Sequence, residues 1–373
     1  MAESTPFLDL VQQGIDGFLS EHESRLAAIA PELTAFTGHA RELLSGGKRF
    51  RAQFCYWGWK AFSGAPESID PMPVPDSAEA LRPVALAATA LEVFHAAALV
   101  HDDLIDNSDT RRGSPSAHRH LESVHLQSGW LGDGARFGRS AAVLLGDLLL
   151  GWSDELLDRG IAGLPDRRAG LAARAEFNRM RTEVTAGQYL DVLEEHAWNT
   201  VADRDSLSRA HRVIVYKSAK YSIESPLAIG AALAGAPDAQ VDALRAFGLP
   251  LGIAFQLRDD LLGVFGDPER TGKPAGDDLR EGKRTVLIAL ARTALPASSR
   301  RLIDELLGDP GLDEEQVMMI RTALVESGAV AKVEQSIEHN LAAARDALQR
   351  APIGSEARAT LSRLAEAAAR RSA

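Results

Sequence analysis

The sequence is poor in several features that define common protein classes. Its 373 residues contain one cysteine, Cys55, so a disulfide framework within the chain is excluded and a cytoplasmic location is expected. Aromatic residues make up only 6 %, and no segment shows the strand-like alternation of apolar and polar residues. The formal net charge of -11 argues against a general nucleic-acid binder, whose surface is usually basic.

Signals for export and for membrane insertion are also missing. The N-terminal stretch MAESTPFLDL has no basic segment followed by an apolar run, so we expect no signal peptide. We expect no transmembrane segment either, because no stretch reaches the length of a bilayer span. The longest candidate, residues 84–100, contains Glu92 and His95.

Alanine and leucine dominate the composition, which favours helix over sheet. The pattern predicts an all-α protein with a single domain over residues 1–373, in which residues 1–5 and a Pro-rich loop at 64–78 are flexible. A polar, Gly-containing connection with room for a short helix is expected at 113–139, and a Gly-rich loop at 266–282. Helices are expected, among others, over residues 6–31, 32–45, 52–63, 84–106 and 238–263, the last interrupted near the stretch GLPLG.

The stretch HDDLIDNSDTRR at residues 101–112 places a block of negative charge at the end of an apolar helix. Carboxylates are least favoured there, because the C-terminal end of a helix carries the negative half of its dipole. Asp102 and Asp106 also share one face at a spacing of four residues, where like charges repel. A bound cation would remove both objections. The alternative is a solvated helix end with arginines as counter-ions.

A second apolar helix also ends in paired aspartates, in the stretch FQLRDDLLGVFGD at residues 255–267. Asp259 and Asp260 follow Gln256 on the same face, and Asp267 lies in the loop beyond. Two such helix ends suggest two carboxylate clusters that face each other across a cavity. Carboxylates without cysteine ligands favour a hard divalent cation, and Mg²⁺ is typically shared with substrate phosphates.

Basic residues near glycines and polar turns would complete a diphosphate site, since arginine offers a fork to phosphate oxygens and lysine a point charge. For isolated lysines such as Lys217 and Lys283, a solvated surface charge is the alternative on residue type alone. The cations of interest are Lys48, Arg49, Arg51, Arg111, Arg112, Lys217, Lys273 and Lys283.

The motifs GGKRFR, HDDLID with RRG, GQYLD, YKSAKY, FQLRDD and GKPAGDDLREGKRT occur in this order between about residues 46 and 285. Together they resemble the trans-isoprenyl diphosphate synthase family, and most of all its actinobacterial geranylgeranyl diphosphate synthases. The resemblance implies an all-α bundle of the isoprenoid synthase type with a central cavity. It departs from the family pattern at Gly263, where a third carboxylate is expected, and Asp267 is a candidate outer-shell substitute.

The resemblance also implies a role for individual residues. The metal ligands would be Asp102, Asp103, Asp106, Asp259 and Asp260, and these act in catalysis together with Lys217 and Lys273. Isopentenyl diphosphate would be held by Lys48, Arg51, His95 and Arg112. The allylic substrate would be contacted by Arg111, Lys217, Ser218, Gln256, Lys273 and Lys283.

The implied reaction is the Mg²⁺-dependent head-to-tail condensation of isopentenyl diphosphate with dimethylallyl, geranyl or farnesyl diphosphate. Three Mg²⁺ ions per active site are expected, with Mn²⁺ as a substitute, in a homodimer. The product chain would run along the helix that ends in Asp102. Small residues at Ala97 and Ala98 would let a fifteen-carbon chain pass, and Phe94, one turn deeper, is a candidate plug. The expected main product is therefore geranylgeranyl diphosphate, with twenty carbons.

Other functions remain open at this point. The product could have fifteen carbons, or twenty-five and more. A class I terpene cyclase would share the fold and the first aspartate motif but would not need Lys48 and Arg51. A non-catalytic partner subunit would be expected to lose aspartates or lysines that this chain keeps, and a simple acidic helical scaffold is a further alternative.

Overall fold

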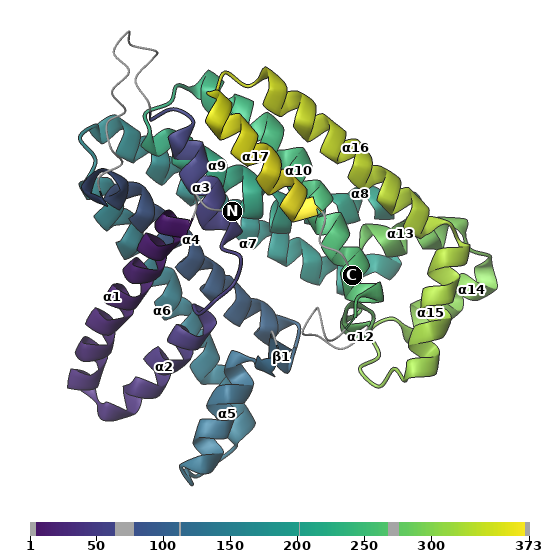
Figure 1. Cartoon of the computed structure of the whole chain (residues 1–373). Coiled ribbons are helices and arrows are strands. Elements are labelled where there is room, and N and C mark those ends of the chain that lie inside the picture. The colour runs from purple at the N-terminus through teal and green to yellow at the C-terminus, as the bar shows by residue number, and fades with distance from the viewer. Residues whose placement is uncertain (1–4, 64–77, 112, 201, 268–275, 370–373) are drawn as a thin grey trace. The chain divides into compact units, whose positions relative to one another are not determined.

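The computed structural model describes residues 5–63, 78–111, 113–200, 202–267 and 276–369, and these are almost entirely helical (Figure 1). The only strands among them are β1 (Thr110–Arg111) and β2 (Ser114–Pro115), which pair antiparallel with Thr110 opposite Pro115. The all-α prediction is thereby confirmed. The expected flexible segments 1–5 and 64–78 lie almost wholly outside the described residues.

The chain divides into two compact units. Unit 1 comprises residues 1–174 and 229–236, and unit 2 comprises residues 175–228 and 237–373. Two of the three divisions fall inside helices, α7 (Arg167–Ala197) and α9 (Ser225–Leu233). The single domain predicted for residues 1–373 stays a prediction.

Unit 1 is built around a long apolar helix that packs along a second one. The helix α4 (Ala78–Ile105) contacts α6 (Gly134–Ala162) along its length (Figure 1). Both helices carry fully buried alanines and leucines, such as Ala87, Leu91 and Leu145. The other elements of this unit are α1 (Thr5–Ile29), η1 (Pro31–Leu33), α2 (Thr34–Leu43), α3 (Phe50–Lys60) and α5 (Ala117–Gln127).

Unit 2 is organised around α10 (Asp238–Phe265), which packs on α16 (Ala329–Arg350) and on the π-helix η3 (Ile214–Glu224). Arg258 of α10 forms a two-pronged ion pair with Glu334 of α16, at 2.6 and 2.7 Å. The remaining elements are η2 (Trp198–Thr200), α8 (Asp203–Val213), α12 (Asp277–Glu281), α13 (Val286–Ala294), α14 (Ala297–Leu306), α15 (Glu314–Glu326) and α17 (Ser355–Ala369).

Two expectations about these helices were wrong. No stretch long enough to cross a membrane was expected, but residues Glu79–Ile105 are long and apolar enough to do so. Within the protein, 72 % of the most apolar window of this helix is buried, as in the core helix of a globular protein. The interruption expected near GLPLG is absent, because α10 continues through Pro250. Proline inside a helix costs about 3 kcal/mol, and the complete burial of Phe247 and Leu251 on either side offsets that cost.

The close approach of α9 to α3 in unit 1 gives a stability prediction. A Cβ atom at Gly230 would overlap the carbonyl oxygen of Cys55. Gly230→Ala should therefore lower the free energy of unfolding by about 1–3 kcal/mol or more, as overpacking does. The matched control is Gly151→Ala on α6, where nothing lies within 4 Å of the added atom. Alanine is favoured over glycine in a helix by up to about 1 kcal/mol, so the control should be neutral or stabilising. Urea unfolding measures both, and equal effects would contradict this packing.

Candidate active site

The first aspartate cluster lies at the C-terminal end of α4 in unit 1. Asp102 and Asp106 are half-buried and four residues apart, so they share one face of the helix. Asp103 is different, because its side chain is only 1 % exposed. The three aspartates predicted as metal ligands therefore divide into two on an accessible face and one buried against protein.

A short hairpin supplies the counter-charge for Asp103. After α4 the chain reverses at Asn107, whose φ of 52° is left-handed, and β1 returns toward the helix end. This brings Arg111 onto Asp103, to which its Nε donates a hydrogen bond of 2.9 Å. The Arg111 guanidinium also lies 3.7 Å from Asp102. Arginine is thus a counter-ion here, as in the alternative of a solvated helix end, but the Asp103 carboxylate that it pairs with is buried rather than solvated.

The segment between α2 and α3 separates a structural cation from an exposed one. Arg49 has a left-handed φ of 50° and lies 3.4 Å from the buried carboxylate of Glu92 on α4. The same carboxylate accepts a 3.1 Å hydrogen bond from the backbone N–H of Ala52, at the start of α3. Lys48 remains exposed, and Arg51 is half-buried. Of this cluster, Lys48 is the cation placed to reach a ligand in solvent.

The second aspartate cluster lies near the C-terminal end of α10 in unit 2. Asp259 is half-buried, and Asp260 is 6 % exposed. Gln256 donates a 2.8 Å hydrogen bond to one oxygen of Asp260, whereas the other oxygen has no hydrogen-bond partner among the described residues. Burial raises the pKa of Asp260 to about 8, the Gln256 hydrogen bond opposes that rise, and the carboxylates of Asp278, Asp259 and Asp191 add to it.

Two carboxylates near this cluster were not predicted as site residues. Asp278 of α12 occupies the space beside Gly263, where a Cβ atom would overlap its carboxylate. The glycine at the third position of the motif thus makes room for a carboxylate from another element. Asp267, the expected substitute, is exposed. The sequence signal for Asp278 was its place in the motif GKPAGDDLREGKRT.

Asp191 of α7 is the second carboxylate that was not predicted as a site residue. It forms an ion pair with Lys217, which was predicted as one. The ammonium of Lys217 lies 2.5 Å from the Asp191 carboxylate. Lys217 and the half-buried Ser218 belong to η3, and π-helical turns are frequent at functional sites. A Cβ atom at Gly187 would overlap the backbone at Lys217, so this glycine lets α7 approach η3 closely enough for the ion pair.

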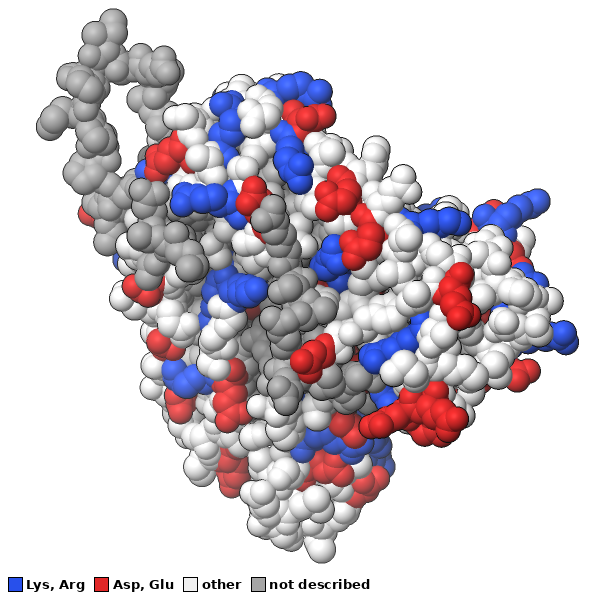
Figure 2. Space-filling view, turned by 45° about the vertical axis from the view of Figure 1, so that its right-hand side comes forward, with Lys and Arg blue, Asp and Glu red and all other residues white. Residues whose placement is uncertain are grey.

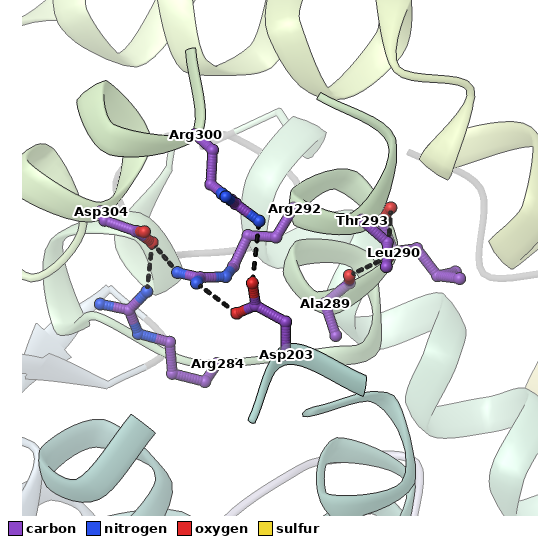
Figure 3. Close-up of polar contacts among 8 residues, drawn as sticks. All are labelled: Asp203, Arg284, Ala289, Leu290, Arg292, Thr293, Arg300 and Asp304. Atoms are coloured by element: carbon purple, nitrogen blue, oxygen red, sulfur yellow. Dashed lines mark hydrogen bonds and ion pairs between the residues drawn. The ribbon is translucent and has the colours of Figure 1, made fainter. Parts of the chain in front are cut away.

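The segment that carries Lys283 is anchored by a cluster of opposite charges (Figure 3). The neighbouring Arg284 donates a 3.1 Å hydrogen bond to Asp304, and its guanidinium lies 3.8 Å from the centre of the Trp198 ring. Arg292 contacts both Asp304 and Asp203, and Arg300 also pairs with Asp203. Lys283 itself is 3.2 Å from Glu281 and 16 % exposed, so it is not a solvated surface charge.

On α4, the half-buried positions mark the face that continues inward from Asp102. They include His95, Ala98 and Leu99, which follow the spacing of one helix face. Ala97 is fully buried and Phe94 is 4 % exposed, so both are more deeply packed than Ala98. Arg112 and Lys273 lie outside the described residues.

The two aspartate clusters belong to different units, so their predicted arrangement across a cavity stays a prediction. Within unit 1 the structure brings together Asp102, Asp103 and Arg111. Within unit 2 it brings together Asp191, Lys217, Gln256, Asp259, Asp260 and Asp278.

This all-α protein, in which two apolar helices each end in a pair of aspartates, is a prenyltransferase. The chain belongs to the polyprenyl synthetase family, whose profile, described as Polyprenyl synthetase, matches residues 34–324. Enzymes of this family depend on Mg²⁺ and use isopentenyl and allylic diphosphates.

Individual relatives agree with this assignment. The chain is 33 % identical over 273 residues to the geranylfarnesyl diphosphate synthase of Aeropyrum pernix, covering 73 % of this chain and 77 % of that protein. It is 34 % identical to the geranylgeranyl diphosphate synthase of Mycobacterium tuberculosis over 66 % of this chain and 59 % of that protein. The geranylgeranyl pyrophosphate synthase of Corynebacterium glutamicum, crystallised with isoprenyl diphosphate and magnesium, superimposes with a TM-score of 0.89 at 39 % identity, covering 98 % of this chain and 99 % of that one.

The raised pKa of Asp260 predicts a pH-dependent stability in metal-free buffer. The folded protein keeps this proton up to about pH 8, whereas the unfolded chain loses it near the ordinary value of 3.8. The stabilising contribution of the protonated side chain is therefore complete below pH 4 and is lost as the pH rises toward 8, by at most about 1.4 kcal/mol per pH unit.

Asp260→Asn, which cannot ionise, should consequently gain stability relative to the wild type between pH 4 and 8. Urea unfolding of both proteins in the presence of a chelator measures the difference. As a control, Asp278→Asn removes a neighbouring charge that raises the pKa of Asp260. In this variant the loss of stability with rising pH should therefore end at a lower pH than in the wild type. A difference between Asp260→Asn and wild type that does not change with pH would disprove the assignment.

Proposed function

We propose that this prenyltransferase makes geranylgeranyl diphosphate as its main product, by adding isopentenyl diphosphate to dimethylallyl, geranyl and farnesyl diphosphates. The observation that carries the proposal is the small half-buried Ala98, one turn below Asp102 on the accessible face of α4. Its position would let a fifteen-carbon chain continue along the helix. The geranylgeranyl diphosphate synthases among the relatives support the same chain length.

The donor sets fit Mg²⁺, because each consists of carboxylate oxygens without cysteine or histidine ligands. The oxygen of Asp260 without a hydrogen-bond partner, in a group of four neighbouring acids, is suited to a cation that would compensate their charge. We assign Asp102, Asp106 and Asp259 as direct ligands because they are half-buried, and Asp260 because one of its oxygens has no hydrogen-bond partner among the described residues. Three ions per site are expected, and Mn²⁺ should substitute.

Asp103 and Asp278 have supporting roles in this assignment. Asp103, buried against Arg111, fixes the hairpin and the end of α4. Asp278 takes the place of the third carboxylate missing at Gly263, because its side chain already occupies that space. The exposed Asp267 is then not needed as a substitute.

The reaction begins when the C1–O bond of the allylic diphosphate breaks and leaves an allylic cation. When bound, Mg²⁺ supplies charge neutralisation for the departing diphosphate. Lys217, Lys273, Lys283 and Arg111 add positive charge where negative charge develops, which stabilises the transition state. Gln256 and Ser218 position the allylic substrate. The apolar wall of α4 excludes water that would otherwise quench the cation.

The second substrate would bind at the cations that follow α2. Lys48, Arg51, His95 and Arg112 hold the diphosphate of isopentenyl diphosphate, whose double bond attacks the allylic cation. The departing diphosphate then accepts the proton that is lost. Correct placement of the two substrates supplies much of the rate enhancement. Support comes from the exposure of Lys48 and from the position of His95 on the same half-buried face as Asp102.

We also infer a homodimer in the cytoplasm. Unit 1 carries exposed apolar side chains on α5 and α6 and between them, including Leu131 at 98 %, Leu126 at 65 % and Leu144 at 60 % exposure, which a second copy would cover. The single cysteine is buried and free, as expected in a reducing compartment. Among the described residues on the face shown in Figure 2, basic and acidic side chains are intermingled and form no continuous basic patch.

The test of this function is product analysis of the purified protein with isopentenyl diphosphate and each allylic primer. A twenty-carbon diphosphate as the main product supports the proposal, whereas farnesyl or longer diphosphates would correct the chain length. Incubation with geranylgeranyl diphosphate alone identifies a terpene cyclase, because only a cyclase would release a hydrocarbon.

The metal assignment predicts a large kinetic effect. Asp102→Ala and Asp259→Ala should each reduce turnover by about 10²–10³-fold or more, because the charge of the departing diphosphate is no longer neutralised. Circular dichroism should show an unchanged fold. The controls Glu79→Ala and Asp238→Ala remove exposed acids at the opposite ends of the same helices. They should leave turnover nearly unchanged, and near-normal turnover of either aspartate variant at saturating Mg²⁺ would refute the two-cluster assignment.

The chain-length assignment predicts a change of product. Ala98→Phe should shorten the dominant product to fifteen carbons by blocking the accessible face, and Phe94→Ala should lengthen it by removing the plug one turn, about 5.4 Å, deeper. Ala98→Ser, which stays small, is the control and should keep the wild-type product. Chromatography of the dephosphorylated products measures all three. An active Ala98→Phe variant with an unchanged product would show that the chain does not follow α4.

A further inference from the structure

Three potential metal ligands meet in unit 1 outside the candidate active site. His39 and Glu42 lie three residues apart on α2, so they share one face of that helix, and His120 lies on α5. Each offers one nitrogen or oxygen atom, and these three atoms all lie within 4.8 Å of one another. The proposed prenyl-transfer reaction uses none of the three.

The contacts among these residues are close. The Nδ1 atom of His39 lies 3.3 Å from a carboxylate oxygen of Glu42. The rings of His39 and His120 are stacked, with their centres 4.4 Å apart and an angle of 20° between the planes. Stacked imidazoles do not hold each other by hydrogen bonds, and Glu42 contacts only the Nδ1 atom of His39.

His39 supplies the observation that points to a ligand. Its side chain is 4 % exposed, and its buried Nε2 atom has no hydrogen-bond partner among the described residues. Leaving a buried polar atom without a partner is unfavourable. An imidazole nitrogen is a common ligand of transition metals.

We propose that His39, Glu42 and His120 form a binding site for a divalent transition metal of the Zn²⁺ type, which fastens α2 to α5. Two imidazoles and one carboxylate, with water as a fourth ligand, are a donor set for Zn²⁺. Imidazole is a poor ligand for Mg²⁺, so the site is chemically distinct from the aspartate clusters.

The geometry requires only a modest adjustment. Metal–ligand bonds of about 2.0–2.1 Å in a tetrahedron place ligand atoms about 3.4 Å apart. The present separations therefore have to shrink by up to about 1.4 Å, starting from the observed limit of 4.8 Å. The side chain of Glu42 is 68 % exposed, and His120 is half-buried. Because α2 leads into the segment that carries Lys48, the metal restrains that segment without entering the reaction.

The experiment is a titration of the full-length protein, freed of metals with a chelator, against Zn²⁺ in excess Mg²⁺. The Mg²⁺ occupies oxygen-ligand sites, so calorimetry reports the histidine site. Co²⁺ is a second probe, because its visible absorption reports nitrogen ligands in tetrahedral geometry. His120→Ala and Glu42→Gln are the test variants, since they change side chains outside the fully buried core. The control is His339→Ala, which removes an exposed histidine in unit 2.

The wild type and His339→Ala should bind one Zn²⁺ with equal affinity and show a higher Tm when it is bound. His120→Ala should weaken binding by more than about tenfold, since even the loss of a residue that supports a metal ligand weakens binding 10–100-fold. Both test variants should retain turnover with Mg²⁺. Equal Zn²⁺ affinity in wild type and His120→Ala, or a Co²⁺ spectrum that this variant leaves unchanged, would overturn the site.

Discussion

Carboxylates that are held close together, partly away from water, are the constraint on which the rest of this structure depends. Helical periodicity brings Asp102 and Asp106 onto one face of α4, and the fold gathers Asp191, Asp259, Asp260 and Asp278 in unit 2. Like charges repel strongly in such surroundings, because the effective dielectric constant is far below that of water. Each cluster must therefore include groups that reduce its net charge.

The two units reduce the net negative charge of their carboxylate clusters in different ways. In unit 1 a hairpin returns an arginine to the helix end, so that Asp103 is buried with its counter-ion already in place. In unit 2 Lys217 neutralises Asp191, whereas Asp260 is relieved by keeping its proton. The first solution is a fixed ion pair, and the second is a carboxyl group that stays neutral because burial raises its pKa.

Glycines set the distances on which these pairings rely. Gly187 lets α7 approach the backbone of η3 at Lys217, and Gly263 leaves space for the carboxylate of Asp278. Gly248 of α10 would meet the backbone of Glu224 in η3 at 2.9 Å if it carried a Cβ atom. The π-helical winding of η3 lies between these contacts, so close packing surrounds the segment that presents Lys217 and Ser218.

The sequence by itself determined the helical class, the two apolar helices that end in aspartates, and the family. These follow from local composition, from the spacing of residues along one helix, and from motifs that are read in order. It could not show that Pro250 is accommodated without a break, because burial on both sides of α10 decides that. Nor could it separate Arg49, which pairs with Glu92 on another helix, from the exposed Lys48 beside it. Asp191 and Asp278 come from elements far along the chain, so only the tertiary structure could place them beside Asp260, where distance and burial decide the pKa.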